Sequence, residues 1–138
     1  MVGRMRRRLL LVLAAAALAT GARGAHAEGK DAKKKAGGES YLPIQTLTAY
    51  TVKPGGRRGV MTVDCGLDIP DAGLRQRADL LLPRLRASYV QSVQIYAGGL
   101  PYGYPPNPDF LARTLQRSTD EILGRRGARL LMGAVIVN

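Results

Sequence analysis

The residues from Met61 to Ile69 alternate between apolar side chains and polar or small ones. The apolar positions are Met61, Val63, Cys65, Leu67 and Ile69, and the positions between them are Thr62, Asp64, Gly66 and Asp68. Because successive side chains of a strand point to opposite faces, this alternation predicts a strand with one face buried and the other in water.

The apolar spacing changes to that of a helix after Pro70. The apolar stripe consists of Leu74, Ala78, Leu81, Leu85, Tyr89 and Tyr96, and Ser88 and Ser92 share it. It predicts an amphipathic helix over about 71–97, which Asp68 or Asp71 can begin by accepting hydrogen bonds from the first turn. Pro83 lies inside this helix, where proline removes a donor and crowds the preceding turn. We therefore expect a kink between Asp79 and Pro83.

A hairpin is predicted before this helix. Leu47 to Val52 is a β-branched and aromatic run that is typical of a strand. Pro54-Gly55-Gly56 then reverses the chain, and the run from Val60 to Ile69 returns. Residues 46–69 should accordingly form an antiparallel hairpin.

A second helix and a final strand follow. Asn107 is a good N-cap, Pro108 suits the first helical position and Gly124 is a natural stop. The buried stripe of this helix, predicted over 108–123, is Leu111, Leu115, Ile122 and Leu123. Residues 129–137 are almost continuously apolar, which favours an interior strand covered on both faces. The fold class predicted is α+β: a small antiparallel or mixed sheet, made of the hairpin 46–69 and the C-terminal strand 129–137, packed against two helices.

The N-terminus has the pattern of an export signal. Arginines from Arg4 to Arg8 precede an apolar run, and Ala25-His26-Ala27 fits the small-residue cleavage pattern. We expect a signal peptide over 1–27 with cleavage after Ala27, a flexible basic leader over 28–40 and one domain over 41–138. An uncleaved segment that anchors the chain in the inner membrane is the alternative. Both place the domain in the periplasm, and the paired arginines also fit the twin-arginine export route.

Charge narrows the choice of partners. The formal net charge is +11, and removing the five arginines of the signal leaves +6, because 11 − 5 = 6. The basic residues are scattered, whereas nucleic-acid binders gather them on one stripe, so a nucleic-acid partner is disfavoured. Lys33, Lys34 and Lys35 in the leader are candidates for contact with an anionic membrane surface, and a solvated tether is the competing interpretation.

The chain offers few groups for catalysis or metal binding. It has one cysteine and one histidine, and His26 belongs to the predicted signal. Cys65 lies on the apolar face of its strand, where a buried thiol is expected. We therefore predict no catalytic residue, no metal site and no cofactor. Asp64 and Asp68 share the solvent-facing side of the same strand and are the candidates for an acid–base pair, although a solubilised outer face is the favoured interpretation.

The segment from Ala97 to Pro106 is rich in glycine, proline and tyrosine, a composition that excludes a helix. Rigid aromatic side chains on an exposed loop are enriched at contact surfaces. Leu100, Tyr102 and Tyr104 are therefore candidate partner-binding residues. The alternative is a loop whose rings only cover the edge of the core.

The order of these segments resembles a known family. Tyr41-Leu42-Pro43-Ile44 opens the domain, the hairpin and Asp68-Ile69-Pro70-Asp71 follow, and Leu82 to Arg86 lies in the first helix. Asn107-Pro108-Asp109 and the apolar C-terminal strand complete a pattern similar to the periplasmic domain of the flagellar basal-body FliL family. The resemblance covers roughly Tyr41 to Asn138 and implies a fold like the stomatin and prohibitin scaffold domains, with binding to flagellar stator units and no catalysis. The cleavable signal and the tyrosine loop depart from the family.

Two functions follow from these patterns. The first is a non-catalytic periplasmic binding or scaffold protein, with envelope proteins, flagellar stator components among them, as partners and with self-association through a sheet edge or helices. The second is a small periplasmic hydrolase or carbohydrate-binding enzyme that uses Asp64 and Asp68 with Tyr102 or Tyr104. A concave pocket that gathers these four side chains favours the enzyme, whereas an exposed apolar or aromatic patch favours the binder.

Overall fold

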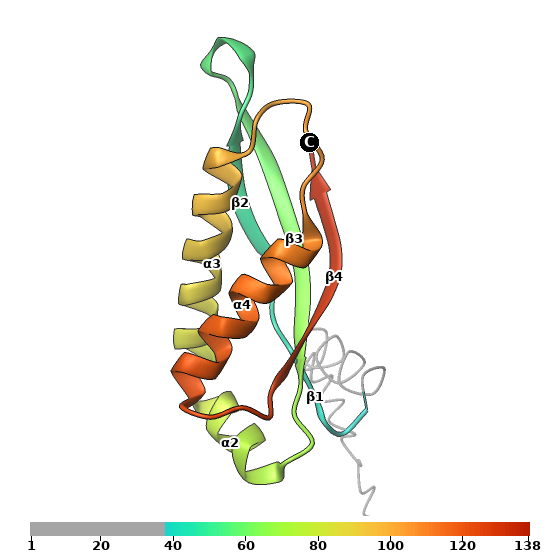
Figure 1. The fold of residues 1–138 in the computed structure, drawn as a ribbon, viewed down its shortest axis with the longest axis vertical. Helices are drawn as coiled ribbons and strands as arrows, with labels where there is room; N and C mark the ends of the chain where they lie inside the picture. The colour runs from blue at the N-terminus through green and yellow to red at the C-terminus, as the bar shows by residue number, and fades with distance from the viewer. Residues whose placement is uncertain (1–37) are drawn as a thin grey trace, which may run out of the picture.

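An antiparallel sheet with helices packed on one face makes up the described part of the chain, residues 38–138 of a computed structural model (Figure 1). The elements in chain order are β1 (Tyr41–Pro43), β2 (Leu47–Val52), the 3-10 turn η1 (Pro54–Gly56), β3 (Arg58–Asp68), α2 (Ala72–Leu80), α3 (Leu82–Gly99), α4 (Pro108–Leu123) and β4 (Arg129–Val137). The α+β class is confirmed. The predicted signal peptide, most of the leader and the three lysines lie outside the described residues.

Strand β3 is the centre of the sheet. Along one side it pairs with β2 over Arg58–Val63 and with β1 over Gly66–Asp68, so these two short strands lie end to end. Strand β4 pairs with the other side of β3, and every pairing is antiparallel. The prediction of an interior C-terminal strand is therefore wrong. β4 is an edge strand, and its outward-facing Leu131 and Ile136 are 36% and 50% exposed.

The predicted kink is a complete break that divides the first helical region into α2 and α3. Asp71, not Asp68, is the N-cap of α2, and its carboxylate accepts from the N–H of Leu74 at 2.7 Å. Leu81 leaves helical geometry at φ −91° and ψ 5°. Pro83 then lies in the first turn of α3, where its missing N–H leaves no helical bond unmade.

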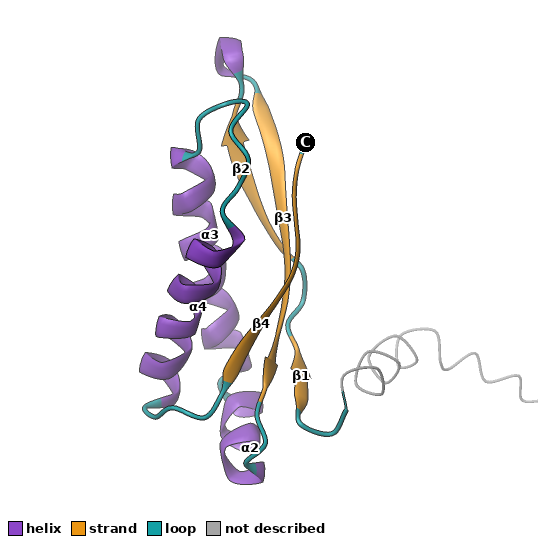
Figure 2. Ribbon diagram, turned by 45° about the vertical axis from the view of Figure 1, so that its right-hand side comes forward, coloured by secondary structure: helices purple, strands orange, loops and turns teal. Residues whose placement is uncertain are grey.

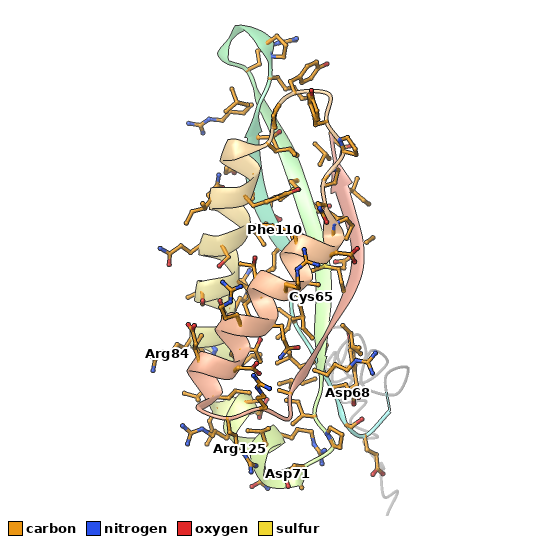
Figure 3. All side chains as sticks on the ribbon, in the orientation of Figure 1. Cys65, Asp68, Asp71, Arg84, Phe110 and Arg125 are labelled. Atoms are coloured by element: carbon orange, nitrogen blue, oxygen red, sulfur yellow. The ribbon has the colours of Figure 1, made fainter. Side chains whose placement is uncertain are left out.

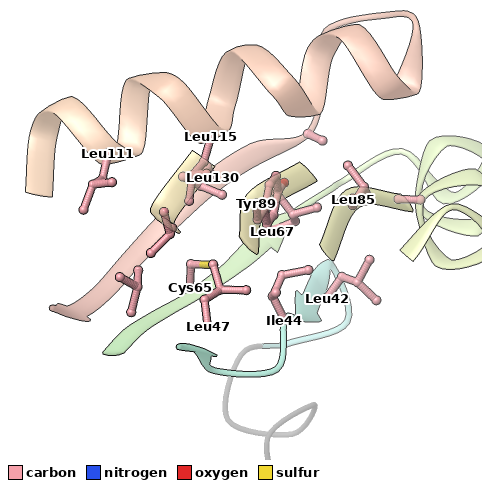
Figure 4. Close-up of a cluster of buried hydrophobic side chains, with 14 of the residues drawn as sticks. Leu42, Ile44, Leu47, Cys65, Leu67, Leu85, Tyr89, Leu111, Leu115 and Leu130 are labelled. Atoms are coloured by element: carbon pink, nitrogen blue, oxygen red, sulfur yellow. The ribbon is translucent and has the colours of Figure 1, made fainter. Parts of the chain in front are cut away.

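The core lies between the sheet and the helices (Figure 4). All five apolar positions of the Met61–Ile69 alternation are buried, as predicted. On α3 the buried residues after Tyr89 are Val93 and Ala97, whereas Tyr96 is only partly buried. The hydroxyl of Thr119 donates to the carbonyl of Leu115 at 2.7 Å and accepts from the Tyr89 hydroxyl. The buried hydroxyls of Tyr89 and Thr119 are thus both satisfied.

Two glutamines complete the hydrogen bonding at the edges of the sheet. The side chain of Gln94 on α3 accepts from the N–H of Tyr50 at 3.0 Å and donates to its carbonyl at 3.1 Å, which satisfies both backbone groups of Tyr50 at the outer edge of β2. Gln116 on α4 accepts from the N–H of Leu130 and donates to the carbonyl of Ala128, both at 2.7 Å. The start of β4 is covered in this way, and no such contact covers the edge from Met132 to Val137 in the described chain.

Candidate interaction site

The loop that joins α3 to α4 presents two tyrosines on an ordered turn. The N–H of Tyr104 donates to the carbonyl of Pro101 at 3.2 Å, and Gly103 adopts a φ of 82°. Glycine at the third position of such a turn accepts this φ without strain. Tyr102 and Tyr104 are 65% and 67% exposed. Figures 1 and 2 place this loop at the end of the molecule that also holds η1 and the C-terminus.

The base of the loop is held by aromatic contacts. The hydroxyl of Tyr96 accepts from the N–H of Asn107 at 2.7 Å, and its ring stacks on Phe110 with centroids 5.6 Å apart. The side chain of Asn107 caps α4 by accepting from the N–H of Phe110 at 3.0 Å. Phe110 is itself 47% exposed and is labelled beside the start of α4 in Figure 3. The exposed tyrosines therefore project from an anchored loop.

The loop is shorter than predicted. Ala97, Gly98 and Gly99 continue α3, and Ala97 is completely buried. Burial of this side chain offsets part of the helical cost of the two glycines, which is about 1 kcal/mol each. Leu100, the first residue after the helix, is partly buried, so only Tyr102 and Tyr104 of the three predicted contact residues are fully presented to solvent.

The face of the sheet opposite the helices carries a second apolar surface. We call it the open sheet face, and its exposed apolar residues are Tyr50, Val52, Val60, Leu131 and Ile136. Figure 2 shows the helices on the other side of the strands. The guanidinium of Arg58 lies 5.6 Å from the ring centroid of Tyr50, an attractive cation–π distance.

Sequence reasoning missed the open sheet face, although its signals are present in β2 and β4. The buried and exposed residues of β2 alternate strictly, with Tyr50 and Val52 on the exposed side. Apolar residues at those positions, together with the unbroken apolar character of β4, were the available evidence for a sheet with one uncovered face.

The thiol of Cys65, the single cysteine of the chain, is buried and has a raised pKa. Cys65 is 6% exposed, and burial, with a smaller contribution from the charge of Asp64, raises its pKa to about 12. A thiol with this pKa stays protonated at neutral pH and is a poor nucleophile. Burial also raises the pKa of Tyr89 to about 12. Both groups therefore carry their protons at neutral pH.

The two carboxylates of the enzyme hypothesis have separate partners. Asp64 accepts from the hydroxyl of Thr46 at 2.6 Å, and Asp68 accepts from the hydroxyl of Ser40 at 2.5 Å. Asp68 is labelled toward the lower end of the molecule in Figure 3, whereas the tyrosine loop lies at the upper end. The four side chains of that hypothesis are not brought together.

A shallow depression lies between α4 and the start of β4. It is lined by Ala112, Arg113, Gln116, Arg117, Asp120 and Leu130. Within residues 38–138 no three side chains of the types that bind metals come together. None of the helices described has the length and apolar character needed to cross a membrane.

Within residues 38–138, the ion pair that forms lies at the end of the molecule far from the loop. Arg125 contacts the carboxylate of Asp71 at 2.6 Å, and both side chains are more than half exposed. The hydrogen bond from the backbone of Leu74 is the main reason that the pKa of Asp71 is lowered, with Arg125 adding to it. This contact joins the end of α4 to the N-cap of α2 and is structural.

No protein-family model matches the sequence, and no curated protein matches it either.

Proposed function

We propose that this protein is a non-catalytic binding or scaffold domain of the bacterial periplasm, related in organisation to the FliL domain and acting on protein partners of the cell envelope. The observation that carries the proposal is the presentation of Tyr102 and Tyr104, 65% and 67% exposed, on a turn anchored by Tyr96 and Asn107. Holding exposed aromatic side chains in place reduces the entropy lost on binding. The dispersed carboxylates and the protonated thiol give no support to a catalytic alternative.

The order of elements supports the choice of partner class. The resemblance to the FliL family rests on a hairpin, a helix that contains Leu82 to Arg86, a second helix that begins at Asn107, and an apolar C-terminal strand. That resemblance suggests an envelope complex, with flagellar stator components as the first candidates. A role in another envelope complex is equally compatible with the proposal, because the tyrosine loop departs from the family pattern and can serve a different partner.

Crosslinking in intact cells, followed by identification of the captured proteins, tests the proposal. The double substitution Tyr102→Ser and Tyr104→Ser should reduce the yield of the captured partner at least tenfold, because a tyrosine that serves as a binding hot spot contributes about 2 kcal/mol or more to an interface. The melting temperature should hardly change, since both side chains are exposed. Leu80→Ser is the matched control, because Leu80 is 82% exposed and lies on α2, away from the loop.

Two outcomes would contradict the proposal. Capture that is equally efficient with the double variant would remove the loop from the function. Turnover of any substrate by the purified protein, abolished by a substitution of Asp64 or Asp68 that leaves the fold intact, would establish the enzyme instead.

A further inference from the structure

The uncovered edge of β4, from Met132 to Val137, is the strongest feature that the proposed function leaves unused. An unpaired strand edge is a row of free backbone donors and acceptors, and natural proteins cover such edges or place charges on them. Here Gln94 covers the edge of β2 at Tyr50, and Gln116 covers only the start of β4. No charged residue occurs between Arg129 and the C-terminal Asn138.

The direction of the backbone groups follows from the ladder with β3. Asn138 exchanges both hydrogen bonds with Val60, at 2.9 and 3.1 Å, so its backbone groups face β3. Alternation along an antiparallel strand then turns the groups of Val137 and Val135 away from β3. At the other end, the N–H of Leu130 faces away because it reaches Gln116, and the same alternation turns Met132 outward.

A bulge at Gly133 and Ala134 makes this edge symmetrical. Val63 pairs with Val135 and Cys65 with Met132, so β4 has one more residue than β3 over this stretch, as in a β-bulge. On both sides of the bulge the pattern is the same. Leu130, Met132, Val135 and Val137 share the face of their inward-pointing β3 partners, and Leu131 and Ile136 lie on the open sheet face.

We propose that β4 pairs with β4 of a second copy of this chain, antiparallel and about a two-fold axis at Gly133 and Ala134. In this register Met132 exchanges backbone hydrogen bonds with Val135 of the partner subunit. Leu131 lies opposite Ile136 of the partner subunit on the open sheet face, so apolar residues meet apolar residues on both faces. The smallest side chains of the strand lie at the axis.

A second copy suits this edge because a two-fold interface requires a surface that complements itself. The pairing extends the sheet across two subunits and places the exposed apolar residues of their open sheet faces side by side. It also places two tyrosine loops in one particle. Self-association of this kind does not depend on the partner of the loop, so failure of one proposal leaves the other standing.

Charge substitutions on the purified full chain test the pairing and its register. Leu131→Lys with Ile136→Lys places like charges opposite each other at both cross-subunit pairs, which is unfavourable, and should convert the dimer to monomer in sedimentation velocity. Leu131→Glu with Ile136→Lys places opposite charges there and should restore the dimer relative to the double lysine variant. Leu80→Lys with Ile95→Lys is the control, because these residues are 82% and 70% exposed on the helices. This control should remain dimeric.

Disulfide formation gives an independent test of the register. Leu131→Cys with Ile136→Cys should form crosslinked dimers on mild oxidation, because the two positions form a closely spaced cross-strand pair within disulfide range. Within one chain these positions are five residues apart, roughly 16 Å along a strand, and cannot bridge. Neither single variant should crosslink. A wild-type chain that stays monomeric at millimolar concentration, a double lysine variant that remains dimeric, or crosslinking by a single variant would overturn the proposed pairing.

Discussion

Cys65 shows how one residue on the central strand is fixed by its surroundings. Its side chain lies in the core cluster with Leu47, Leu67 and Tyr89 (Figure 4), and burial raises its pKa to about 12. A group whose folded-state pKa is raised favours folding while it is protonated. The stabilisation is therefore complete below the pKa of the unfolded thiol, 9.0, and decreases as the pH rises from there toward 12.

Replacing Cys65 with Val should flatten this dependence. Between pH 9 and about 12 the unfolded thiol loses its proton and the folded one keeps it, so each pH unit lowers the free energy of unfolding by up to about 1.4 kcal/mol. Urea unfolding of both proteins at pH 8 and pH 10 measures the difference. The variant should lose about 1 kcal/mol or less at pH 8 through altered packing and should keep its partner. Loss of partner capture by a fully folded variant would assign the thiol a role in function.

At the scale of elements, the ends of helices and strands are set by short-range contacts. Asp71 and Asn107 each accept a hydrogen bond from the backbone N–H three residues on, and Gly124 ends α4 at a φ of 76°. Pro83 is tolerated because Leu81 has already left the helix. Each of these positions was marked in the sequence by a residue type with a known conformational preference.

At the bulge of β4, Gly133 lies closer to Asp64 than a side chain normally lies to its neighbours. A Cβ on Gly133 would lie 3.1 Å from the carbonyl oxygen of Asp64 and 3.2 Å from its Cβ. Gly133→Ala should therefore destabilise the fold by about 1–3 kcal/mol, as overpacking does. Gly98→Ala is the control, because a Cβ there meets nothing within 4 Å and alanine is favoured over glycine in a helix by up to about 1 kcal/mol. Thermal unfolding compares the two, and an equally stable Gly133→Ala protein would contradict the close approach.

At the scale of the whole molecule, the predicted export determines which partners the exposed surfaces can meet. The structure of residues 38–138 separates a face packed by helices from an open sheet face and places the tyrosine loop at one end (Figures 1 and 2). Under the proposed function these surfaces bind partners that the domain can reach, and the N-terminal pattern predicts delivery to the periplasm.

N-terminal sequencing of the protein recovered from the cell envelope checks this prediction. The mature chain should begin at Glu28, because the small residues of Ala25-His26-Ala27 suit signal peptidase. Ala27→Arg is the matched variant, since a large charged residue at the cleavage position should block processing and retain the precursor. Recovery of an unprocessed, membrane-bound wild-type chain would support the anchored alternative instead.

Much of the fold was determined by the sequence alone. The period-two pattern of β3 identified its buried face, and the caps identified both ends of α4. These features depend on residues a few positions apart, so local periodicity and turn chemistry are sufficient to predict them. The loop tyrosines were found in the same way, from composition between two strongly marked helices.

The position of β4 in the sheet was decided only by the tertiary structure. An apolar run predicts a strand but does not distinguish an interior position in the sheet from an edge position. The neighbours of a strand are determined by contacts between distant parts of the chain. Strand β3 has 11 residues, enough to pair with β1 and β2 end to end on one side, which leaves β4 alone on the other. That arrangement exposes Leu131 and Ile136 and creates the edge and the open face.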